Sequence, residues 1–328
     1  MHKQYNSVYA RHIHQYIEMK RKLGFKFETQ AGVLLVFDRL AEKSGEISKG
    51  ISRELAEKWG KRKPNESERY RYDRVRIVAQ FSMFLRDLGI ESFVFKVPPM
   101  PNDTFIPHIY SPKEIEAIFK AADQLVIDKR YMNSCIFSIP LLLRLLYATG
   151  IRIGEALNLS DDDINIDEKY LRVKDSKNGK QRIIPISESL VNVCKEYLKQ
   201  KQQLPIGKIK SKYFFVKVDG RKCSRLAVAN WFKECLRKAD IRCVQRNHFP
   251  RIHDLRHTFA VISLATMAEA GIDLYASLPI LSTYLGHQSL DATNHYVRLT
   301  ANMYPDLIKD VDVICLDVFP KLKNYEAN

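Results

Sequence analysis

The chain has 328 residues and 45% hydrophobic content, which suffices for two domains that each bury a core. Its formal net charge is +15 at pH 7, and both the first hundred residues and the remainder contribute to the basic excess. This balance excludes an acidic, self-solvating protein and favours a polyanionic partner, above all a nucleic acid. Ribosomal and membrane-surface proteins share the same charge balance.

Cysteine usage and apolar runs exclude further classes of protein. The six cysteines form no C-x-x-C pair, which argues against a zinc site and against the disulfide framework of a secreted domain. The stretch Met1–Tyr5 lacks the apolar core of a signal peptide, and no run of residues has the apolar length of a membrane span. We therefore expect a soluble, cytoplasmic protein, associated with the nucleoid if it binds DNA, that makes no membrane contact.

The first 96 residues predict a bundle of four helices. Apolar residues at helical spacing predict helices over 9–23 and 29–41. Ser52 is a suitable N-cap for a short third helix, and a longer fourth helix follows Pro64. Four helices of this size form a small domain with its own core.

The fourth helix begins with a strongly basic run. Its predicted cap is Asn65 or Ser67, and it ends at Gly89. A charged run of this kind is usually a solvated face. Here the charges are nearly all of one sign and alternate with tyrosines, so we interpret the run as a surface that contacts DNA phosphates. Its predicted DNA-binding residues are Arg69, Arg71, Arg74 and Arg76.

A linker separates this bundle from the rest of the chain. Residues 97–112 contain five prolines in a weakly periodic stretch, a composition typical of a stiff connection. We therefore predict a helical domain over 1–96, a linker over 97–112 and a second domain over 113–328.

The second domain is predicted to be mainly helical with a small sheet. Ser111 followed by a proline is a good helix start, and the apolar stretch Pro140–Leu146 is a core helix. Short β-like runs are predicted at 164–166, 170–173 and 182–186. Asn178-Gly179 between the last two runs indicates a tight turn. Helices are predicted to resume at Ser187, over 225–238 and from His253 to the end.

Several residues of the second domain could carry chemistry, although each has an ordinary explanation when it is taken alone. An arginine at a helix start is usually a surface ion-pair partner, a lysine in a hairpin turn is usually solvated, and a tyrosine on an amphipathic helix is usually core. The set comprises Arg152, Glu155, Lys177, Lys180, His253, Arg256, His287 and Tyr296.

Together these residue types suit phosphodiester chemistry without a metal ion or other cofactor. Two guanidiniums can neutralise the charge that grows on the phosphate oxygens in the transition state. A histidine can transfer a proton or donate a hydrogen bond, and a tyrosine hydroxyl can attack phosphorus to give a covalent ester. A lysine can protonate the departing 5′ oxygen. Because the ester keeps the energy of the broken bond, rejoining needs no ATP.

The order of these residues resembles that of the tyrosine recombinase, or phage integrase, family. Thr149-Gly-Ile-Arg152-Ile-Gly-Glu155 resembles its first-arginine motif, and Lys177-Asn-Gly-Lys180 resembles its β-hairpin lysine motif. His253-Asp-Leu-Arg256-His257-Thr resembles a third motif, and Leu285-Gly-His287 followed by Tyr296 resembles the last. The motifs cover roughly residues 110–300, and the four together are highly specific.

The resemblance implies a role for each matching residue. Tyr296 would be the nucleophile that forms a 3′-phosphotyrosyl link, and Tyr304 is a rival for that role. Arg152 and Arg256 would clamp the scissile phosphate. The remaining implied roles are general acid for Lys177, acid/base for His253, phosphate hydrogen bonding for His287 and support of the site for Glu155. Lys180, which matches the second lysine of its motif, is the less favoured candidate for the general acid and is placed among the DNA contacts.

The resemblance also implies an architecture and an assembly. The N-terminal bundle would be the family's core-binding domain, and the second domain would be a mostly helical catalytic domain with a three-stranded sheet. Two such domains would close around double-stranded DNA at a specific site, within a homotetramer that acts with or without partner recombinases. The apolar tail after Tyr304 would dock into the next protomer. Residues 267–275 resemble an extension relative to compact members.

The expected function is site-specific recombination for the integration, excision or transposition of a mobile element. Two alternatives remain open from the residues. One is DNA relaxation like that of a type IB topoisomerase, which needs neither a defined site nor a tetramer. The other is a DNA-binding accessory protein that has lost catalysis, against which the complete residue set argues.

Overall fold

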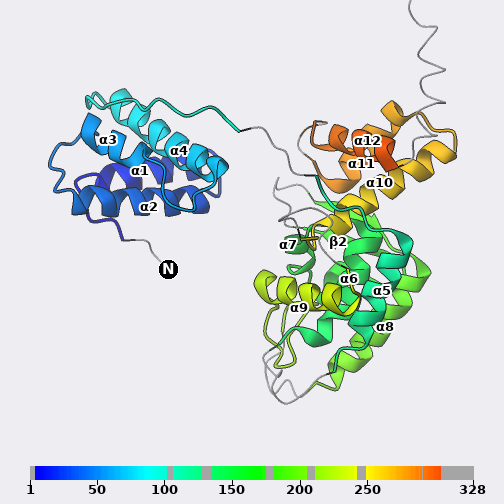
Figure 1. The fold of residues 1–328 in the computed structure, drawn as a ribbon. Coiled ribbons are helices and arrows are strands. Elements are labelled where there is room, and N and C mark those ends of the chain that lie inside the picture. The colour runs from blue at the N-terminus through cyan, green and yellow to red at the C-terminus, as the bar shows by residue number, and fades with distance from the viewer. Residues whose placement is uncertain are drawn as a thin grey trace, which may run out of the picture. The chain divides into compact units, whose positions relative to one another are not determined.

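The computed structural model describes residues 4–101, 106–126, 134–174, 181–204, 211–241, 249–287, 289 and 291–303. The chain divides into two compact units, Met1–Phe105 and Ile106–Asn328 (Figure 1). The predicted fold class, mainly α with one small sheet, is confirmed for the described residues. None of the helices in these ranges is both long and apolar enough to cross a membrane.

The first unit contains four helices, as the apolar spacing predicts. They are α1 (Ala10–Lys22), α2 (Glu28–Lys43), α3 (Arg53–Gly60) and α4 (Glu68–Asp87). Ser52 and Ser67 accept backbone N–H groups at the starts of α3 and α4, so Ser67 and not Asn65 caps the fourth helix. Buried aromatic side chains fill the space between the helices; they include Tyr9, Tyr16, Phe37, Trp59 and Phe81.

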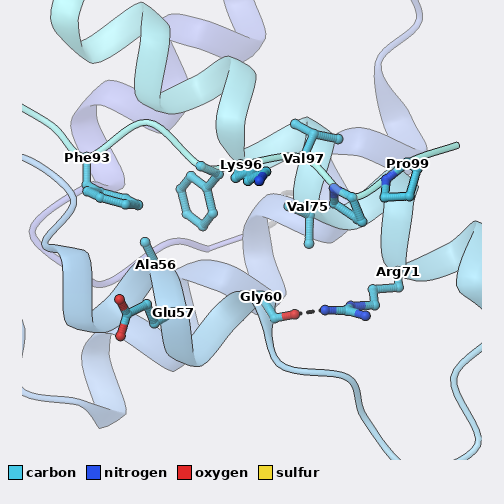
Figure 2. Close-up of a pocket in the computed structure, with 11 residues that line it drawn as sticks. Ala56, Glu57, Gly60, Arg71, Val75, Phe93, Lys96, Val97 and Pro99 are labelled. Atoms are coloured by element: carbon cyan, nitrogen blue, oxygen red, sulfur yellow. Dashed lines mark hydrogen bonds between the residues drawn. The ribbon is translucent and has the colours of Figure 1, made fainter.

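A pocket of about 400 Å³ lies in this unit between α3, α4 and the extended segment that follows α4. Its walls are largely apolar and include Ala56, Val75 and Phe95. Arg71 crosses one side of it and donates to the carbonyl oxygen of Gly60 at 3.2 Å (Figure 2). Arg71, one of the four arginines predicted to contact phosphates, therefore lines this pocket.

The second unit begins with helices packed around one large apolar core. The elements are α5 (Pro112–Asp123), the 3-10 turn η2 (Ile136–Ser138), α6 (Ile139–Thr149), α7 (Ile153–Ala156), η3 (Asp161–Asp163), α8 (Glu188–Gln202) and α9 (Arg225–Lys238). Ser111 forms a capping box with Glu114 at the start of α5, and Ser187 caps α8. The leucines of α6 are almost all buried, so this helix forms the centre of the core.

A small antiparallel sheet follows α7. Its strands β1 (Ile164–Asn165), β2 (Tyr170–Val173) and β3 (Arg182–Pro185) lie in the order β1-β2-β3. Leu171 is opposite Ile184, and both are fully buried, which fixes the register of the β2–β3 pair. The predicted turn that joins these strands, including Lys177 and Lys180, lies outside the described residues.

Three further helices, α10 (Asp254–Glu269), α11 (Leu274–Leu285) and α12 (Asp291–Met303), form a second cluster. Leucines from α10 and α11 pack with Tyr296 and Leu299 of α12 in a separate apolar core. Helix α10 also packs against α6, so it joins this cluster to the large core (Figure 1). The predicted extension at 267–275 consists of the end of α10, a turn at Gly271 and the start of α11.

Candidate active site

Arg256 lies in the first turn of α10, where that helix contacts two other parts of the second unit. Its side chain is buried, and its guanidinium donates to the carbonyl oxygens of Gly150 at 2.8 Å and Leu285 at 2.9 Å. It also donates to Nε2 of His287 at 2.9 Å. Burial and the charge of Arg152 lower its pKa to about 10, which leaves it charged at neutral pH.

Arg152 and Arg182 share one buried carboxylate. Arg152, at the start of α7, donates from Nη1 to Glu155 at 3.0 Å and from Nη2 to the carbonyl oxygen of Gly286 at 3.1 Å. Arg182, at the start of β3, donates to both carboxylate oxygens of Glu155, at 2.8 and 3.2 Å. Burial alone would raise the pKa of Glu155, but hydrogen bonding and charge from Arg182 and Arg152 lower it.

Two positions in the quoted motifs require glycine. Gly150 and Gly286 have φ angles of 60° and 68°, and each ends a helix in the left-handed conformation. A Cβ atom at Gly150 would lie 2.4 Å from the Phe259 ring, and one at Gly286 would lie 2.9 Å from Nη1 of Arg182. Glycine at these positions lets the two carbonyl oxygens reach Arg256 and Arg152.

His287 is hydrogen-bonded through both of its ring nitrogens. Because arginine can only donate, Nε2 accepts from Arg256, and Nδ1 therefore carries the proton and donates to Oγ1 of Thr293 at 2.7 Å. Burial, followed by the charges of Arg256 and Arg152, lowers its pKa to about 4. The ring is thus neutral at pH 7, with the lone pair of Nε2 facing the arginines.

Tyr296 of α12 is buried, with 3% of its surface exposed, and its ring stacks on His287 at 6.1 Å between ring centres. Its hydroxyl lies 3.1 Å from Nδ1 of His257, the residue that follows Arg256 on α10. Burial raises the pKa of Tyr296, and the positive charge of Arg256 opposes that effect only in part. The phenol therefore keeps its proton at neutral pH.

His253 lies at the start of α10, with its ring edge-to-face against His257 at 4.9 Å between ring centres. Burial and the charges of Arg256, Arg251 and Arg152 lower its pKa to about 4. The histidines at 253, 257 and 287 are therefore all uncharged at pH 7. Their neutrality leaves the arginines as the charged groups of the cluster.

The described part of the site carries excess positive charge. The cluster holds three guanidiniums, from Arg152, Arg182 and Arg256, but one carboxylate, that of Glu155, which pairs with the first two. Such an arrangement suits an anion, and the planar donors of arginine match phosphate oxygens in particular. No cluster of metal-binding side chains occurs among the described residues. The arrangement can hold a phosphodiester beside a tyrosine hydroxyl.

The structure brings five of the six predicted catalytic residues, together with the supporting Glu155, into one unit. Arg152, His253, Arg256, His287 and Tyr296 are joined by the contacts described above. The sixth, Lys177, lies outside the described residues, as do Lys180, the rival nucleophile Tyr304 and the apolar tail.

One predicted DNA-binding residue of α4 needs correction. Arg74 is 1% exposed and pairs with both carboxylate oxygens of Glu66, while it also donates to the carbonyl oxygens of Trp59 and Lys61. All three of its guanidinium nitrogens thus donate inside the unit, so this buried side chain holds the loop before α4 and is not available to a phosphate. The prediction for Arg74 was wrong because α4 points this position inward.

The other arginines of the basic run remain accessible to different degrees. Arg69 and Arg76 are exposed and pair with Asp73 at 3.3 and 3.4 Å. Arg71 is partly exposed and lies along the pocket described above. Exposed ion pairs of this kind contribute little stability, so a phosphate can compete for these side chains.

Sequence reasoning missed three residues of the cluster: Arg182, His257 and Thr293. Arg182 opens a predicted strand, where an arginine carries no special signal. His257 directly follows Arg256 within a quoted motif, and its position one turn after His253 was the available clue. Thr293 lies six residues after His287 in a stretch with no distinctive pattern.

Comparisons with known proteins agree with this site. The sequence profile of the phage integrase family matches residues 109–303. The chain is 31% identical over 312 residues to y4rB, an inferred integrase/recombinase of Sinorhizobium fredii, with 93% of this chain and 96% of that protein covered. It is 31% identical over 228 residues to the tyrosine recombinase XerA of Pyrococcus horikoshii, covering 69% of this chain and 68% of that one.

A solved structure shares the fold. The XerH site-specific recombinase, in a post-cleavage complex with its palindromic difH substrate, aligns with a TM-score of 0.61 at 19% identity, covering 85% of this chain and 78% of that one. The family profile spans more than half of the chain and includes all six predicted catalytic positions. The chain belongs to the phage integrase family, which is the family of the tyrosine recombinases.

Proposed function

We propose that the chain is a site-specific DNA recombinase that cleaves and rejoins strands through a 3′-phosphotyrosyl intermediate. Membership in the family supports DNA strand cleavage and rejoining. The observation that carries the proposal is that a buried tyrosine lies beside a cluster rich in arginines. Tyr296 stacks on His287, and His287 accepts a hydrogen bond from Arg256. A tyrosine in such a place can attack a phosphorus atom held by the arginines.

The main requirement of the attack is neutralisation of the negative charge on the phosphate oxygens. The non-bridging oxygens of the phosphodiester gain negative charge as Tyr296 Oη approaches phosphorus. Arg152 and Arg256 retain unused N–H donors after their contacts with carbonyl oxygens, and these donors are available to the phosphate. Glu155 and Arg182 hold Arg152 in place through the shared carboxylate. The 3′ phosphate becomes bonded to Tyr296 as the bond to the 5′ oxygen breaks; the phenol proton passes to His253, and the 5′ oxygen takes its proton from Lys177.

The histidines start from their neutral forms. His253 serves as the acid/base partner near the phosphate. His287 offers only a lone pair at Nε2, because its proton is on Nδ1. To donate to a phosphate oxygen it must gain a proton at Nε2, which the negative charge of the phosphate favours. Lys177 is the proposed general acid for the 5′ oxygen, and the cycle is proposed to need neither a metal ion nor ATP.

The proposed nucleophile acts on the phosphate held by its own chain. Tyr296 is packed in the apolar core shared by α10, α11 and α12, and its hydroxyl contacts α10 directly. A mixture of Tyr296→Phe and Arg256→Ala chains tests this, because neither chain then holds a complete site. Cleavage that reappears on mixing would show that the tyrosine is supplied by another protomer.

The proposed partner is double-stranded DNA at a specific site, bound by both units with the exposed arginines of α4 on the backbone. Similar structures include the XerH complex with difH and an integrase of the Tn1549 transposon in complex with a circular intermediate DNA. We propose a homotetramer in synapsis, with or without partner recombinases, in the cytoplasm at the nucleoid. The proposed role is integration, excision or transposition of a mobile element.

A nicked duplex tests the proposal. A target is first selected by binding from a random library, and a nick is placed a few nucleotides 3′ of the scissile phosphate, so that the released fragment diffuses away. We expect a covalent protein–DNA adduct in the presence of EDTA and without ATP. The adduct should vanish in Tyr296→Phe and persist in Tyr304→Phe. An adduct in Tyr296→Phe would overturn the nucleophile assignment.

A further inference from the structure

His257 makes the direct contact with the proposed nucleophile, although the mechanism above gives it no role. Its Nδ1 atom lies 3.1 Å from Oη of Tyr296, and its ring is tilted by 50° to the tyrosine ring at 5.6 Å between centres. Its other ring neighbour is His253. His257 thus stands between the nucleophile and the proposed acid/base residue.

Both partners of this hydrogen bond are uncharged at neutral pH. Burial raises the pKa of Tyr296, so the phenol carries its proton at neutral pH. Burial, followed by repulsion from His253 in its protonated form and by the charge of Arg251, lowers the pKa of His257 to about 3, so its ring is uncharged. Either atom of this pair can donate, and we assign the hydroxyl as the donor to an unprotonated Nδ1, with the ring proton of His257 on Nε2.

We propose that His257 is a positioning residue for the nucleophile: its Nδ1 atom accepts the Tyr296 hydroxyl and thereby fixes the direction of the oxygen's lone pairs. This inference rests on the proposed role of Tyr296. A phenol hydroxyl has one proton, and directing it to Nδ1 leaves the lone pairs of Oη pointing elsewhere. Without that acceptor the O–H group rotates, and attack then waits for the correct orientation.

The position of His257 supports this role over simple packing. It belongs to the same turn of α10 as Arg256, whose guanidinium is tied to Gly150 and Leu285. The helix backbone therefore sets the position of the nucleophile's acceptor relative to a phosphate-binding arginine. Tyr296 is held from the other side by its stacking on His287. A packing residue would need the ring but not its Nδ1 lone pair.

Two amide substitutions of similar size, His257→Asn and His257→Gln, test whether the Nδ1 lone pair matters apart from the bulk of the ring. The Oδ1 atom of an asparagine can occupy the place of Nδ1, whereas the amide of a glutamine reaches the place of Nε2. Single-turnover cleavage of the nicked duplex is measured for the full chain and for His257→Asn, His257→Gln and His257→Leu, with DNA affinity measured alongside. We expect His257→Asn to stay within about 10-fold of the parent, and His257→Gln and His257→Leu to be slower by about 100-fold. DNA affinity should not change.

A substrate with sulfur in place of the bridging 5′ oxygen shows whether a substitution impairs protonation of the leaving group or attack by the nucleophile. A thiolate leaves without a proton, since a thiol has a pKa of about 8.5. It should suppress a defect in Lys177→Ala, the proposed general acid, but not a defect in His257→Gln. Equal rates for His257→Asn and His257→Gln, faster cleavage in either, or rescue of His257→Gln by sulfur would each overturn the inference. Failure of the parent chain to form an adduct would instead overturn the proposed function.

Discussion

Arg152 and Arg256 donate to the carbonyl oxygens of two consecutive residues, Gly286 and Leu285, at the end of α11. The two guanidiniums come from distant parts of the sequence, yet one turn of backbone sets both positions. The same turn carries His287, whose Nε2 accepts from Arg256. The positions of the two arginines proposed to bind phosphate therefore depend in part on how α11 ends.

Replacing Gly286 by alanine tests that dependence. The substitution places a Cβ 2.9 Å from Nη1 of Arg182, so the guanidinium must move and its paired contact with Glu155 weakens. We expect single-turnover cleavage to fall by about 10-fold to 100-fold. Gly271→Ala is the matched control, since Gly271 also has a positive φ but no atom within 4 Å of the added Cβ.

Both substitutions cost about 1–2 kcal/mol of backbone strain, so loss of stability alone does not distinguish them. The difference in cleavage rate between the two variants measures the displacement of Arg182. Equal cleavage by both would show that the end of α11 does not control the arginines.

Glu155→Gln removes a buried charge while it keeps the side-chain shape. Arg182 then loses its paired carboxylate, and breaking a buried pair typically costs about 3–5 kcal/mol. Urea denaturation of the chain should show a less stable second unit, and cleavage should fall as Arg152 loses its support. Asp123→Asn is the control: it breaks a half-exposed pair with Arg144 and should cost less than about 1 kcal/mol. A similar loss in both variants would contradict the supporting role of Glu155.

Local patterns predicted most of the fold. Ser52, Ser111 and Ser187 each cap a helix where the sequence indicates one, because a cap needs only the neighbouring residues. Apolar spacing likewise located the helices and the three strands to within a few residues.

Long-range partners were the part that spacing could not predict. Arg74 and Arg76 look alike in a basic run, but only Arg74 points inward to Glu66, because the position on α4 decides which arginine is buried. The pairing of Arg182 with Glu155 depends on how β3 lies beside α7, which no local pattern specifies. Resemblance to a family supplied the roles, since a motif records which distant residues act together.

Because the fold keeps the histidines of the site uncharged, we expect the second unit to lose stability as the pH falls. Folding lowers the pKa of His253 and His287 to about 4 and that of His257 to about 3, against about 6.5 when unfolded. The unfolded state therefore binds more protons below pH 6.5, so this contribution to stability is complete above that pH and is lost as the pH falls toward 4. Asp254, whose pKa burial raises, acts in the opposite sense.

At pH 5 the loss is about 2 kcal/mol for each histidine, relative to pH 7. Hydrogen exchange of the α10 and α11 amides, corrected for the intrinsic effect of pH on exchange, reports this loss. His287→Asn should remove about one third of the dependence, because an amide does not titrate. Protection that stays constant from pH 7 to pH 5 would show that the histidines are not held neutral by the fold.

The arginines of α4 make separable predictions about DNA binding. Arg69 and Arg76 are exposed beside Asp73, and each phosphate contact that is lost should reduce the slope of log affinity against log salt by about 1. Arg69→Gln and Arg76→Gln are therefore expected to weaken binding at low salt and to change it little at high salt. Arg86→Gln, at the opposite end of the same helix, removes the same charge and should leave the slope unchanged if only the start of α4 contacts DNA.

Arg74→Gln should behave differently from all three variants. Its guanidinium holds Glu66 through both carboxylate oxygens, and that contact lowers the pKa of Glu66 to about 2. Removing it leaves a buried carboxylate without its partner, which typically costs about 3–5 kcal/mol. Thermal denaturation followed by circular dichroism should therefore detect early melting of the first unit, in contrast to Arg69→Gln and Arg76→Gln. If Arg74→Gln instead lowers the salt slope and leaves the melting unchanged, this arginine reaches the phosphates and the burial argument fails.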